Sequence, residues 1–281
     1  MSSSRIYMDW NATAPLLPEA REACLSALDL LGNPSSVHGE GRALRTLVEN
    51  ARRDVALLCG TKPGSVIFTS GATEAANLVL TPDFRMGRTP LKIGRLYASS
   101  IEHPAVREGG RFPREALSEI PVTSDGVVDL PALRDLLTAH DRQLGLPMVA
   151  VMLVNNETGI IQPVAEIAEI VRPHGGILVV DAVQAAGRLP LSIEDLGADF
   201  LIVSSHKIGG PKGAGALVAR GEVMMPAPLI RGGGQEKGHR SGTENTVSIA
   251  GFAAAGMTGL PALAQGAPGA AAQKIADHFS S

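Results

Sequence analysis

Short apolar runs alternate with segments of helical spacing over most of the chain, from about residue 18 to residue 220. Ala, Leu and Val recur at helical spacing in several segments, which predicts helices over 18–31, 42–58, 130–140 and 163–171, and another within "SGATEAANLVL". Unbroken apolar runs predict strands over 65–68, 95–99, 148–154, 175–180 and 200–204. Continuous apolar strands separated by helices are typical of a mainly parallel sheet covered on both faces, so the pattern predicts an α/β fold.

The composition is that of an ordinary globular protein and excludes several classes of function. The 281 residues are 44% hydrophobic and 19% charged, with a net charge of −3 and no basic block, so neither nucleic acid nor membrane is an expected partner. No run approaches the length of a membrane span, and "MSSSRIYMDWNATAP" lacks the regions of a signal peptide. The two cysteines, Cys24 and Cys59, lie in helix-like segments, which indicates a reducing, cytoplasmic setting. No cysteine or histidine cluster has metal-ligand spacing, so no metal site is predicted.

Polar residues follow five of the predicted strands at their carboxyl ends. These residues are 69–73, Glu102 with His103, 155–157, Asp181 with Gln184, and 204–207. The carboxyl ends of parallel strands share one edge of a sheet, and such folds bind ligands at that edge. The sequence therefore predicts one ligand site there.

The segment "SGATEAANLVL" follows the first predicted strand and has two interpretations. A glycine turn with small and hydroxyl residues at a helix start suits a phosphate, because the backbone N–H groups and the helix dipole favour an anion. Alternatively, Ser70 or Thr73 is an ordinary helix cap with Glu74 in the first turn. Both interpretations stay open on the residues alone.

Asp181 and His103 also each have two interpretations. Asp181 ends an apolar strand, where an unpaired carboxylate is costly; it either holds a protonated ring nitrogen of a cofactor or makes a strand-end turn or cap. His103 precedes Pro104, which places it at a loop or a helix entrance. It is either a satisfied polar residue or an imidazole that stacks on an aromatic cofactor and relays protons.

Lys207 follows the apolar run "FLIV" and precedes "IGGPKGAGA", with no acid in the residues that follow to pair with it. A desolvated lysine is costly unless it is neutral or covalently used. A snorkelling surface lysine fits poorly with these neighbours. A lysine, a phosphate cradle and a buried acid are the parts that pyridoxal phosphate needs, because the amine forms a Schiff base while the acid keeps the pyridine nitrogen protonated.

Eight motifs in order along the chain resemble one family. They are "YMDWNATAP", "GNPSSVHGEGR", "FTSGATEAANL", "EHPAV", "VNNETGIIQP", "VDAVQAAGRLPL", "SSHKIGGPKGAGAL" and "RGGGQEKGHRSGTENT". Together they resemble the cysteine desulfurases, which belong to the class V aminotransferase group of pyridoxal phosphate enzymes, over about residues 6 to 255. The resemblance implies the fold type I, aspartate-aminotransferase-like large domain of PLP-dependent transferases.

The resemblance also implies which residues hold the cofactor's phosphate. Ala72 and Thr73, together with Ser204 and His206, would bind it. Thr243, in "RSGTENT", would reach the phosphate of the neighbouring subunit's cofactor, which implies a homodimer.

Around the cofactor ring, the resemblance implies one role for each of five residues. Lys207 would hold the cofactor covalently, and His103 would stack over the ring. Asp181 would pair with the ring nitrogen, Gln184 would bond the phenolic oxygen, and Asn156 would lie near the substrate. Lys207 and His103 are the expected catalytic residues.

The implied reaction removes sulfur from L-cysteine. The amine of Lys207 would take the α-proton of the substrate, and a cysteine thiolate of the enzyme would attack the substrate sulfur. The products would be alanine and a persulfide, which a sulfur acceptor or scaffold protein would use for iron–sulfur clusters or thiolated cofactors.

The sequence departs from the family pattern after "RSGT". There the family carries its nucleophilic cysteine and a carboxylate-binding arginine in a later small domain, whereas this sequence has no cysteine after Cys59. Cys24 and Cys59 are interpreted as small packing residues. We expect an N-terminal arm (1–17), a PLP-binding large domain (18–255) and an atypical tail (256–281) in place of the small domain. Glycines and prolines are expected to break the family's long helix in that tail; they are Gly256, Gly259, Pro261, Gly266, Pro268 and Gly269.

These departures leave two alternatives to a cysteine desulfurase. One is another class V enzyme, a selenocysteine lyase or an aminotransferase, which needs the cofactor chemistry more than a thiol. The other is a non-catalytic protein that pairs with a full-length desulfurase.

Overall fold

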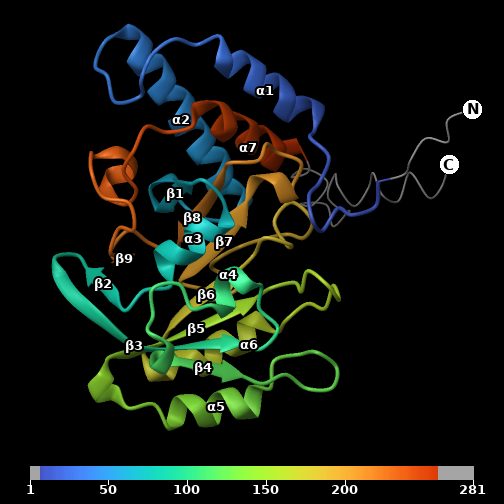
Figure 1. The fold of residues 1–281 in the computed structure, drawn as a ribbon, viewed down its shortest axis with the longest axis vertical. Helices are drawn as coiled ribbons and strands as arrows, with labels where there is room; N and C mark the ends of the chain where they lie inside the picture. The colour runs from blue at the N-terminus through green and yellow to red at the C-terminus, as the bar shows by residue number, and fades with distance from the viewer. Residues whose placement is uncertain (1–6, 259–281) are drawn as a thin grey trace, which may run out of the picture.

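The computed structural model describes residues 7–258, which fold into one mixed sheet with helices on both faces (Figure 1). Within these residues the sheet has nine strands in the order β1-β8-β7-β6-β5-β3-β2-β9, and β4 pairs with β3. The strands are β1 (Val66–Thr69), β2 (Asp83–Met86), β3 (Thr89–Ser99), β4 (Leu117–Ile120), β5 (Leu146–Met152), β6 (Ile177–Asp181), β7 (Phe200–Ser204), β8 (Gly215–Ala219) and β9 (Met224–Pro226).

Most strands of the sheet run in one direction. β3, β4, β5, β6 and β7 pair in parallel, and β8 runs antiparallel to both β7 and β1. β1 therefore points the same way as β7, and the carboxyl ends of β1, β3, β5, β6 and β7 share one edge. The predicted mainly parallel α/β sheet is confirmed.

Helices cover both faces because the strands are apolar on both sides. In β5, Val149 and Val151 face one hydrophobic cluster, while Met148 and Ala150 face the other. The first cluster lies under α1 (Pro18–Leu28), α2 (Gly39–Leu58), α5 (Leu130–Thr138), α6 (Val164–Val171) and α7 (Thr246–Thr258). The second lies under α3 (Ala72–Val79) and the short α4 (Pro104–Arg107).

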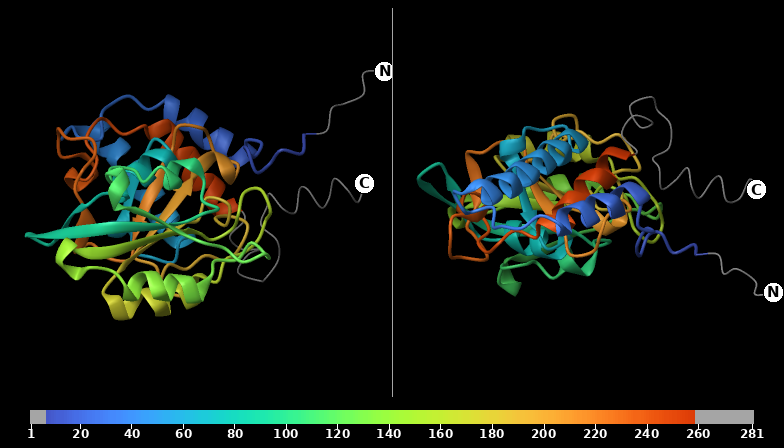
Figure 2. Two further views of the ribbon diagram at one scale, coloured as in Figure 1. Left: turned by 60° about the horizontal axis from the view of Figure 1, so that its bottom comes forward. Right: turned by 90° about the horizontal axis from the view of Figure 1, so that it is seen from above.

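Four strands were not predicted from the sequence: β2, β4, β8 and β9. Each of them either lacks a long apolar run or contains glycine. β2 and the start of β3 form a hairpin that projects from the body of the protein (Figure 2), and most of its residues are exposed. Only the buried end of β3 contains the predicted strand 95–99. β8 is buried throughout but follows a glycine-rich stretch that obscures it. β4 and β9 are short strands of four and three residues.

Helix α7 corrects one prediction about the end of the chain. Gly256 was expected to break the helix, but α7 continues through it to Thr258. A Cβ at Gly256 would lie 3.1 Å from a methyl carbon of Leu58, and one at Gly251 would lie 2.5 Å from the sulfur of Cys24. Glycine therefore serves here to let α7 approach α1 and α2 closely, and that packing offsets its low helix propensity. The other predicted helix breakers lie outside the described residues.

Figure 1 shows α1, α2 and α7 side by side over one end of the sheet, and contacts link α7 to both other helices. Within residues 7–258, no helix combines the length and the hydropathy needed to cross a bilayer.

Candidate functional site

A cavity of about 820 Å³ opens at the shared carboxyl edge of the strands. The N-terminal arm and the loops after β1, β3, β5, β6 and β7 line it. Nine of the ten predicted site residues are among its lining residues: Ala72, Thr73, His103, Asn156, Asp181, Gln184, Ser204, His206 and Lys207. The prediction that one edge of the sheet gathers these side chains is confirmed.

Strand register places Asp181 in the floor of this cavity. Met152 at the end of β5 pairs with Asp181 at the end of β6, and Asp181 pairs with Ile202 of β7. All three residues line the cavity. Burial raises the pKa of Asp181, while the Val183 N–H, which donates to its Oδ1 over 2.9 Å, and the nearby positive charges lower it. The net shift is upward, so burial favours the protonated acid, and a cationic group against Asp181 would restore the carboxylate.

Lys207 lies in the turn Ser205–Lys207 directly after β7 and is half-buried. Its Nζ donates to the carbonyl oxygen of Asn11 in the N-terminal arm. Burial lowers the pKa of Lys207, and the positive charge of Arg188 lowers it further, although Asp181 acts in the opposite direction. A lysine in these surroundings is more readily neutral, and therefore more nucleophilic, than one on an open surface.

His103 caps the short helix α4, as its position before Pro104 suggested. Its Nδ1 accepts the Ala105 N–H over 3.1 Å. In the neutral ring the proton therefore belongs on Nε2. The side chain is exposed and lines the cavity, so the ring is available to a ligand there.

The start of α3 faces the cavity with its amide groups uncapped. Gly71 is the N-cap and makes no side-chain cap, so the alternative with Ser70 or Thr73 as the cap is wrong. Glu74 reaches back instead and accepts the Ser70 N–H over 2.8 Å. The first-turn N–H groups of a helix have no acceptor within the helix, which suits this end of α3 to an anion.

One close backbone approach shapes this end of the cavity. A Cβ at Gly215 of β8 would lie 2.7 Å from backbone atoms of Gly71, so only glycine fits there. Ser204 pairs with Gly215 across β7 and β8 and is buried. This packing holds Ser204 beside the start of α3.

His206 also lines the cavity and contacts the arm. Its Nδ1 lies 3.1 Å from Oγ1 of Thr13. Burial lowers the pKa of His206, and the charges of Lys207 and Lys212 lower it further. The ring is therefore favoured in its neutral form.

Thr243 is the one predicted site residue that the main cavity does not include. It lines a smaller neighbouring cavity of about 160 Å³, and Ser70 and Gly213 line both cavities. Arg240, in the same loop as Thr243, contacts Glu74 with its Nε 2.9 Å from Oε1. The loop is therefore fastened to the first turn of α3.

Several residues of the site were missed from the sequence, and Asn11 is one. Its carbonyl oxygen accepts from Nε2 of Gln184 over 2.9 Å as well as from Lys207. Its Nδ2 donates to the carbonyl oxygen of Asn156 over 3.0 Å. The family-like segment "NAT" was the available signal, but no periodicity places an arm over a distant strand end.

Glu102 was noted at a strand end but given no role. Its side chain is buried, Oε1 accepts the Met152 N–H over 2.7 Å, and Oε2 has no hydrogen-bond partner among the described residues. Burial, together with the negative charge of Asp181, raises the pKa of Glu102 well above its ordinary value. Glu102 is therefore favoured as a neutral acid beside Asp181.

Neither cysteine lies at the cavity. Cys24 is partly buried on α1, and its Sγ lies 3.4 Å from the carbonyl oxygen of Val247. Cys59 is fully buried after α2, and burial raises the pKa of its thiol to about 12. Both serve the packing of the helices, as predicted.

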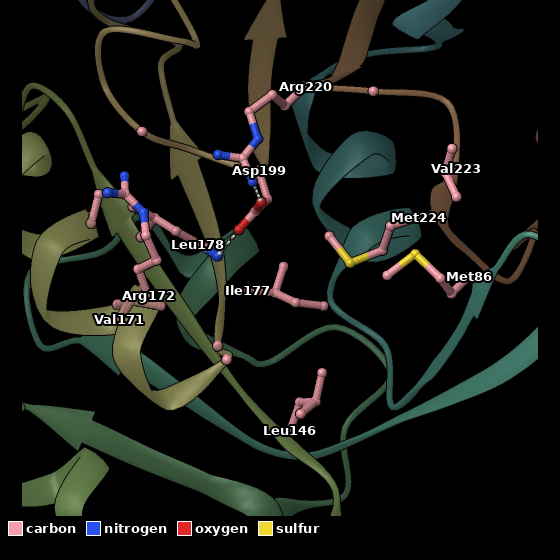
Figure 3. A pocket seen from close by; sticks show the side chains of 15 residues that line it. Met86, Leu146, Val171, Arg172, Ile177, Leu178, Asp199, Arg220, Val223 and Met224 are labelled. Carbon is pink, nitrogen blue, oxygen red and sulfur yellow. Dashed lines mark hydrogen bonds and ion pairs between the residues drawn. The ribbon is translucent and has the colours of Figure 1, made fainter.

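A second cavity, of about 400 Å³, lies on another part of the molecule (Figure 3). Its walls are largely apolar, with Met86, Ile177 and Met224 among them, and Arg220 forms an ion pair of 2.6 Å with Asp199. The residues described as lining this cavity include no lysine, histidine, serine or cysteine. The cavity at the carboxyl edge, in contrast, is lined by lysine, histidine and serine side chains.

The site at that edge fits pyridoxal phosphate. A half-buried lysine, a carboxylate in the floor and an uncapped helix start surround one cavity, which are the groups that the aldehyde, the ring nitrogen and the phosphate require. Fold and site together define an α/β protein of the pyridoxal-phosphate-dependent class.

Comparison with known proteins identifies the family. Residues 6–257 match the family described as aminotransferase class-V, and the chain belongs to that family. The chain is similar to a cysteine desulfurase of Frankia sp. (strain EuIK1), with 39% identity over 274 residues. The matched region covers 92% of this chain but 63% of that relative. It therefore covers less than two thirds of the relative's length.

Solved structures show the same likeness. A NifS-like protein from Rickettsia africae ESF-5 has a TM-score of 0.81 and 34% identity, covering 92% of this chain and 70% of that chain. A structure described as SspA in complex with cysteine has a TM-score of 0.77 and 30% identity, covering 89% and 72%. The class-V aminotransferases and the cysteine desulfurases are pyridoxal-phosphate-dependent enzymes, and the predicted family and fold type are confirmed.

Proposed function

We propose that this chain holds pyridoxal phosphate covalently at Lys207 and acts on L-cysteine as a cysteine desulfurase. One observation carries the proposal: Lys207, in the turn after β7, and Asp181, at the end of β6, line the same cavity together with the uncapped start of α3. The names of the similar proteins, including the structure with cysteine, support this choice of substrate.

The residues that would hold the cofactor divide between its two ends. Ala72, Thr73, Ser204 and His206 would bind the phosphate, since the helix start supplies N–H donors and favours negative charge. At the ring, the Asp181 carboxylate would accept a hydrogen bond from the protonated ring nitrogen. The positive charge of the ring would then offset the effect of burial, which raises the pKa of Asp181.

The remaining ring contacts follow from the side chains at the cavity. Gln184 would donate from its amide to the phenolic oxygen, and His103 would lie over the ring face. Asn156 would lie beside the substrate. When bound, the cofactor supplies an electron sink for the α-carbon of the substrate.

Lys207 would accept the α-proton of the substrate at its Nζ. That step needs a neutral amine, and burial together with the charge of Arg188 lowers the pKa of Lys207 in that direction. His103 would move protons at Nε2, because its Nδ1 is engaged by the Ala105 N–H.

The thiol that accepts sulfur would not come from either cysteine of this sequence. Cys24 and Cys59 pack against helices away from the cavity, and burial raises the pKa of both thiols. A thiolate of a partner or an acceptor protein would take the sulfur, with alanine as the other product. Thr243 would serve a second subunit's cofactor in a homodimer, and the sulfur would go to iron–sulfur or thio-cofactor synthesis.

The position of the cysteines also favours a second candidate. A class V enzyme that needs no thiol of its own, such as a selenocysteine lyase or an aminotransferase, would use Lys207 and Asp181 in the same way. Incubation with L-cysteine and with L-selenocysteine separates the candidates, because only the desulfurase needs an added thiol acceptor to release alanine from L-cysteine.

The test is covalent trapping of the cofactor. The purified chain is loaded with pyridoxal phosphate, reduced with borohydride and digested, and mass spectrometry locates the modified lysine. We expect the adduct on Lys207, its loss in Lys207→Ala, and its retention in Lys212→Ala, a matched control because Lys212 lines the same cavity. An adduct that survives in Lys207→Ala would contradict the assignment.

A further inference from the structure

Arg188 is a half-buried arginine whose hydrogen-bond acceptors are all neutral. Nη1 donates to Oε1 of Gln184 over 2.5 Å and to Oδ1 of Asn11 over 2.9 Å. Nη2 donates to the carbonyl oxygens of Trp10 over 3.1 Å and of Lys207 over 3.3 Å. No carboxylate among the described residues pairs with Arg188, and burial lowers its pKa.

The contact between Arg188 and Gln184 sets the orientation of the Gln184 amide. A guanidinium presents only donors, so the amide oxygen must face it and the NH₂ group must face away. In that orientation Nε2 donates one hydrogen to the Asn11 carbonyl over 2.9 Å and keeps the second. Gln184 is buried and lines the cavity, so the second hydrogen has a defined place in the site.

Arg188 also joins the N-terminal arm to the turn that carries Lys207. Its bonds to Trp10 and Asn11 hold the arm, and its bond to the Lys207 carbonyl holds the turn. Asn11 in turn accepts from Nζ of Lys207. A single side chain thus contacts both Asn11, whose carbonyl accepts from the lysine amine, and the backbone of Lys207 itself.

The charge of Arg188 acts on Lys207 as well. Lys207 faces Asp181 on β6, Asp9 on the arm and Glu157 after β5, and all three carboxylates favour its charged form. Arg188 is the opposing charge, and it lowers the pKa of Lys207 after burial, the larger cause.

We propose that Arg188 is a positioning residue of this site, which orients the Gln184 amide toward the cofactor and holds the Lys207 amine beside the arm. The role rests on the proposed function, because a cofactor at Lys207 is the group that the oriented amide would meet. Arg188 does not line the cavity and acts through Gln184, Asn11 and Lys207.

Two variants separate the positive charge of Arg188 from its planar fork. Arg188→Lys keeps the charge but loses the fork, and Arg188→Gln loses both. We expect both variants to bind pyridoxal phosphate about tenfold more weakly, since a hydrogen bond to a charged group is lost. Arg134→Gln, on the exposed face of α5, is the control and should bind as the parent does.

A mutant cycle tests whether Arg188 acts through Gln184. Gln184→Ala and the double variant Arg188→Gln with Gln184→Ala complete the cycle. We expect the double variant to bind the cofactor no more weakly than Gln184→Ala alone. Fully multiplicative losses would overturn the proposal, because they would show that the two side chains act independently.

A readout without cofactor tests the effect on Lys207. Competitive acetylation of the cofactor-free chain, followed by mass spectrometry across a range of pH, gives the titration midpoint of Lys207. We expect Arg188→Gln to raise this midpoint by about half a pH unit and Arg188→Lys to leave it close to the parent. An unchanged midpoint in Arg188→Gln, with the fold intact by circular dichroism, would overturn the proposal.

The two proposals fail in different ways. If the parent forms no borohydride-stable adduct at Lys207, the proposed function fails. If the parent forms the adduct and both Arg188 variants match it in affinity and in the Lys207 midpoint, only the role of Arg188 fails.

Discussion

Arg52 and Glu236 form a two-point ion pair inside the protein, with Nη1 2.6 Å from Oε2 and Nη2 2.7 Å from Oε1. Their side chains are 7% and 1% exposed. Oε2 of Glu236 also accepts the Phe68 N–H over 2.8 Å, and the guanidinium lies over the Phe68 ring. The pair joins α2, the start of the sheet and the loop that carries Arg240 and Thr243, even though Glu236 adopts a left-handed backbone with φ of 46°.

Breaking this pair on one side should destabilise the chain strongly. Arg52→Met leaves a buried carboxylate without its cation, and we expect the free energy of unfolding to fall by about 3 kcal/mol or more. Urea unfolding followed by circular dichroism measures the loss. The exposed pair of Arg172 and Glu169 supplies the control: Arg172→Met should cost less than about 1 kcal/mol. Equal losses in the two variants would show that burial does not strengthen the Arg52 pair.

The pair of Arg240 and Glu74 should control the affinity for the cofactor's phosphate. Burial alone would raise the pKa of Glu74, but hydrogen bonds from Arg240 and Ser70 hold it below its ordinary value, so a carboxylate stands at the start of α3. Arg240→Ala leaves that negative charge uncompensated, and we expect about tenfold weaker binding of pyridoxal phosphate. Equilibrium titration of the cofactor-free chain measures it.

A second substitution distinguishes charge from loop structure. Arg240→Ala combined with Glu74→Gln removes both charges, so binding should recover most of the loss if charge is the cause. Binding that stays weak in the double variant would instead assign the effect to the loop that carries Thr243.

Glu102 should make the stability of the chain fall as the pH rises. Its pKa is well above the ordinary value, so the folded chain holds a proton that the unfolded chain has lost. The free energy of unfolding therefore starts to fall once the pH exceeds the ordinary glutamate pKa of the unfolded chain. It continues to fall until the pH passes the raised pKa of Glu102 in the folded chain. We expect Glu102→Gln, which stays neutral, to match the parent near about pH 4 and to exceed its free energy of unfolding by about 1 kcal/mol near pH 7.

The pKa of the neighbouring Asp181 is also raised, so Asp181 adds to the same pH dependence. Glu102→Gln is therefore also compared with its parent in an Asp181→Asn background. Glu166→Gln, an exposed substitution on α6, is the control and should track the parent at both pH values. A Glu102→Gln chain that is less stable than the parent near neutral pH would show that Glu102 is ionised.

The cysteines should prove dispensable for any activity. Burial raises the pKa of Cys24 and takes that of Cys59 to about 12, so a thiol reagent should label the native chain slowly and the unfolded chain fast. Cys24→Ser with Cys59→Ser should leave alanine release unchanged within about twofold once an external thiol is present. Loss of persulfide labelling in a folded double variant would identify one of them as a sulfur carrier.

Much of the site could be predicted from the sequence because parallel strands end at one edge. Lys207, Asp181, His103 and Asn156 each follow an apolar run, and that placement alone brings them to one cavity. The class of fold followed from the same pattern, since unbroken apolar strands must be covered on both faces. The eight motifs then indicated the family, which the comparison confirms.

Other features depended on the tertiary structure. The strands β2, β4 and β9 have no strong periodicity of their own. β2 and β4 form by pairing with β3, and β9 forms by pairing with β2. Gly256 was read as a helix breaker from propensity, but close packing against Leu58 outweighs propensity in α7.

The sequence by itself determined the layers of the fold and the residues at the strand ends, because both follow from local hydrophobic pattern. Only the tertiary structure decided that Asn11 of the arm meets Lys207, that Arg188 orients Gln184, and that Glu102 lies beside Asp181. The physical reason is that hydrogen bonds and buried charges depend on distances between segments far apart in the chain, about which spacing along the sequence carries no information.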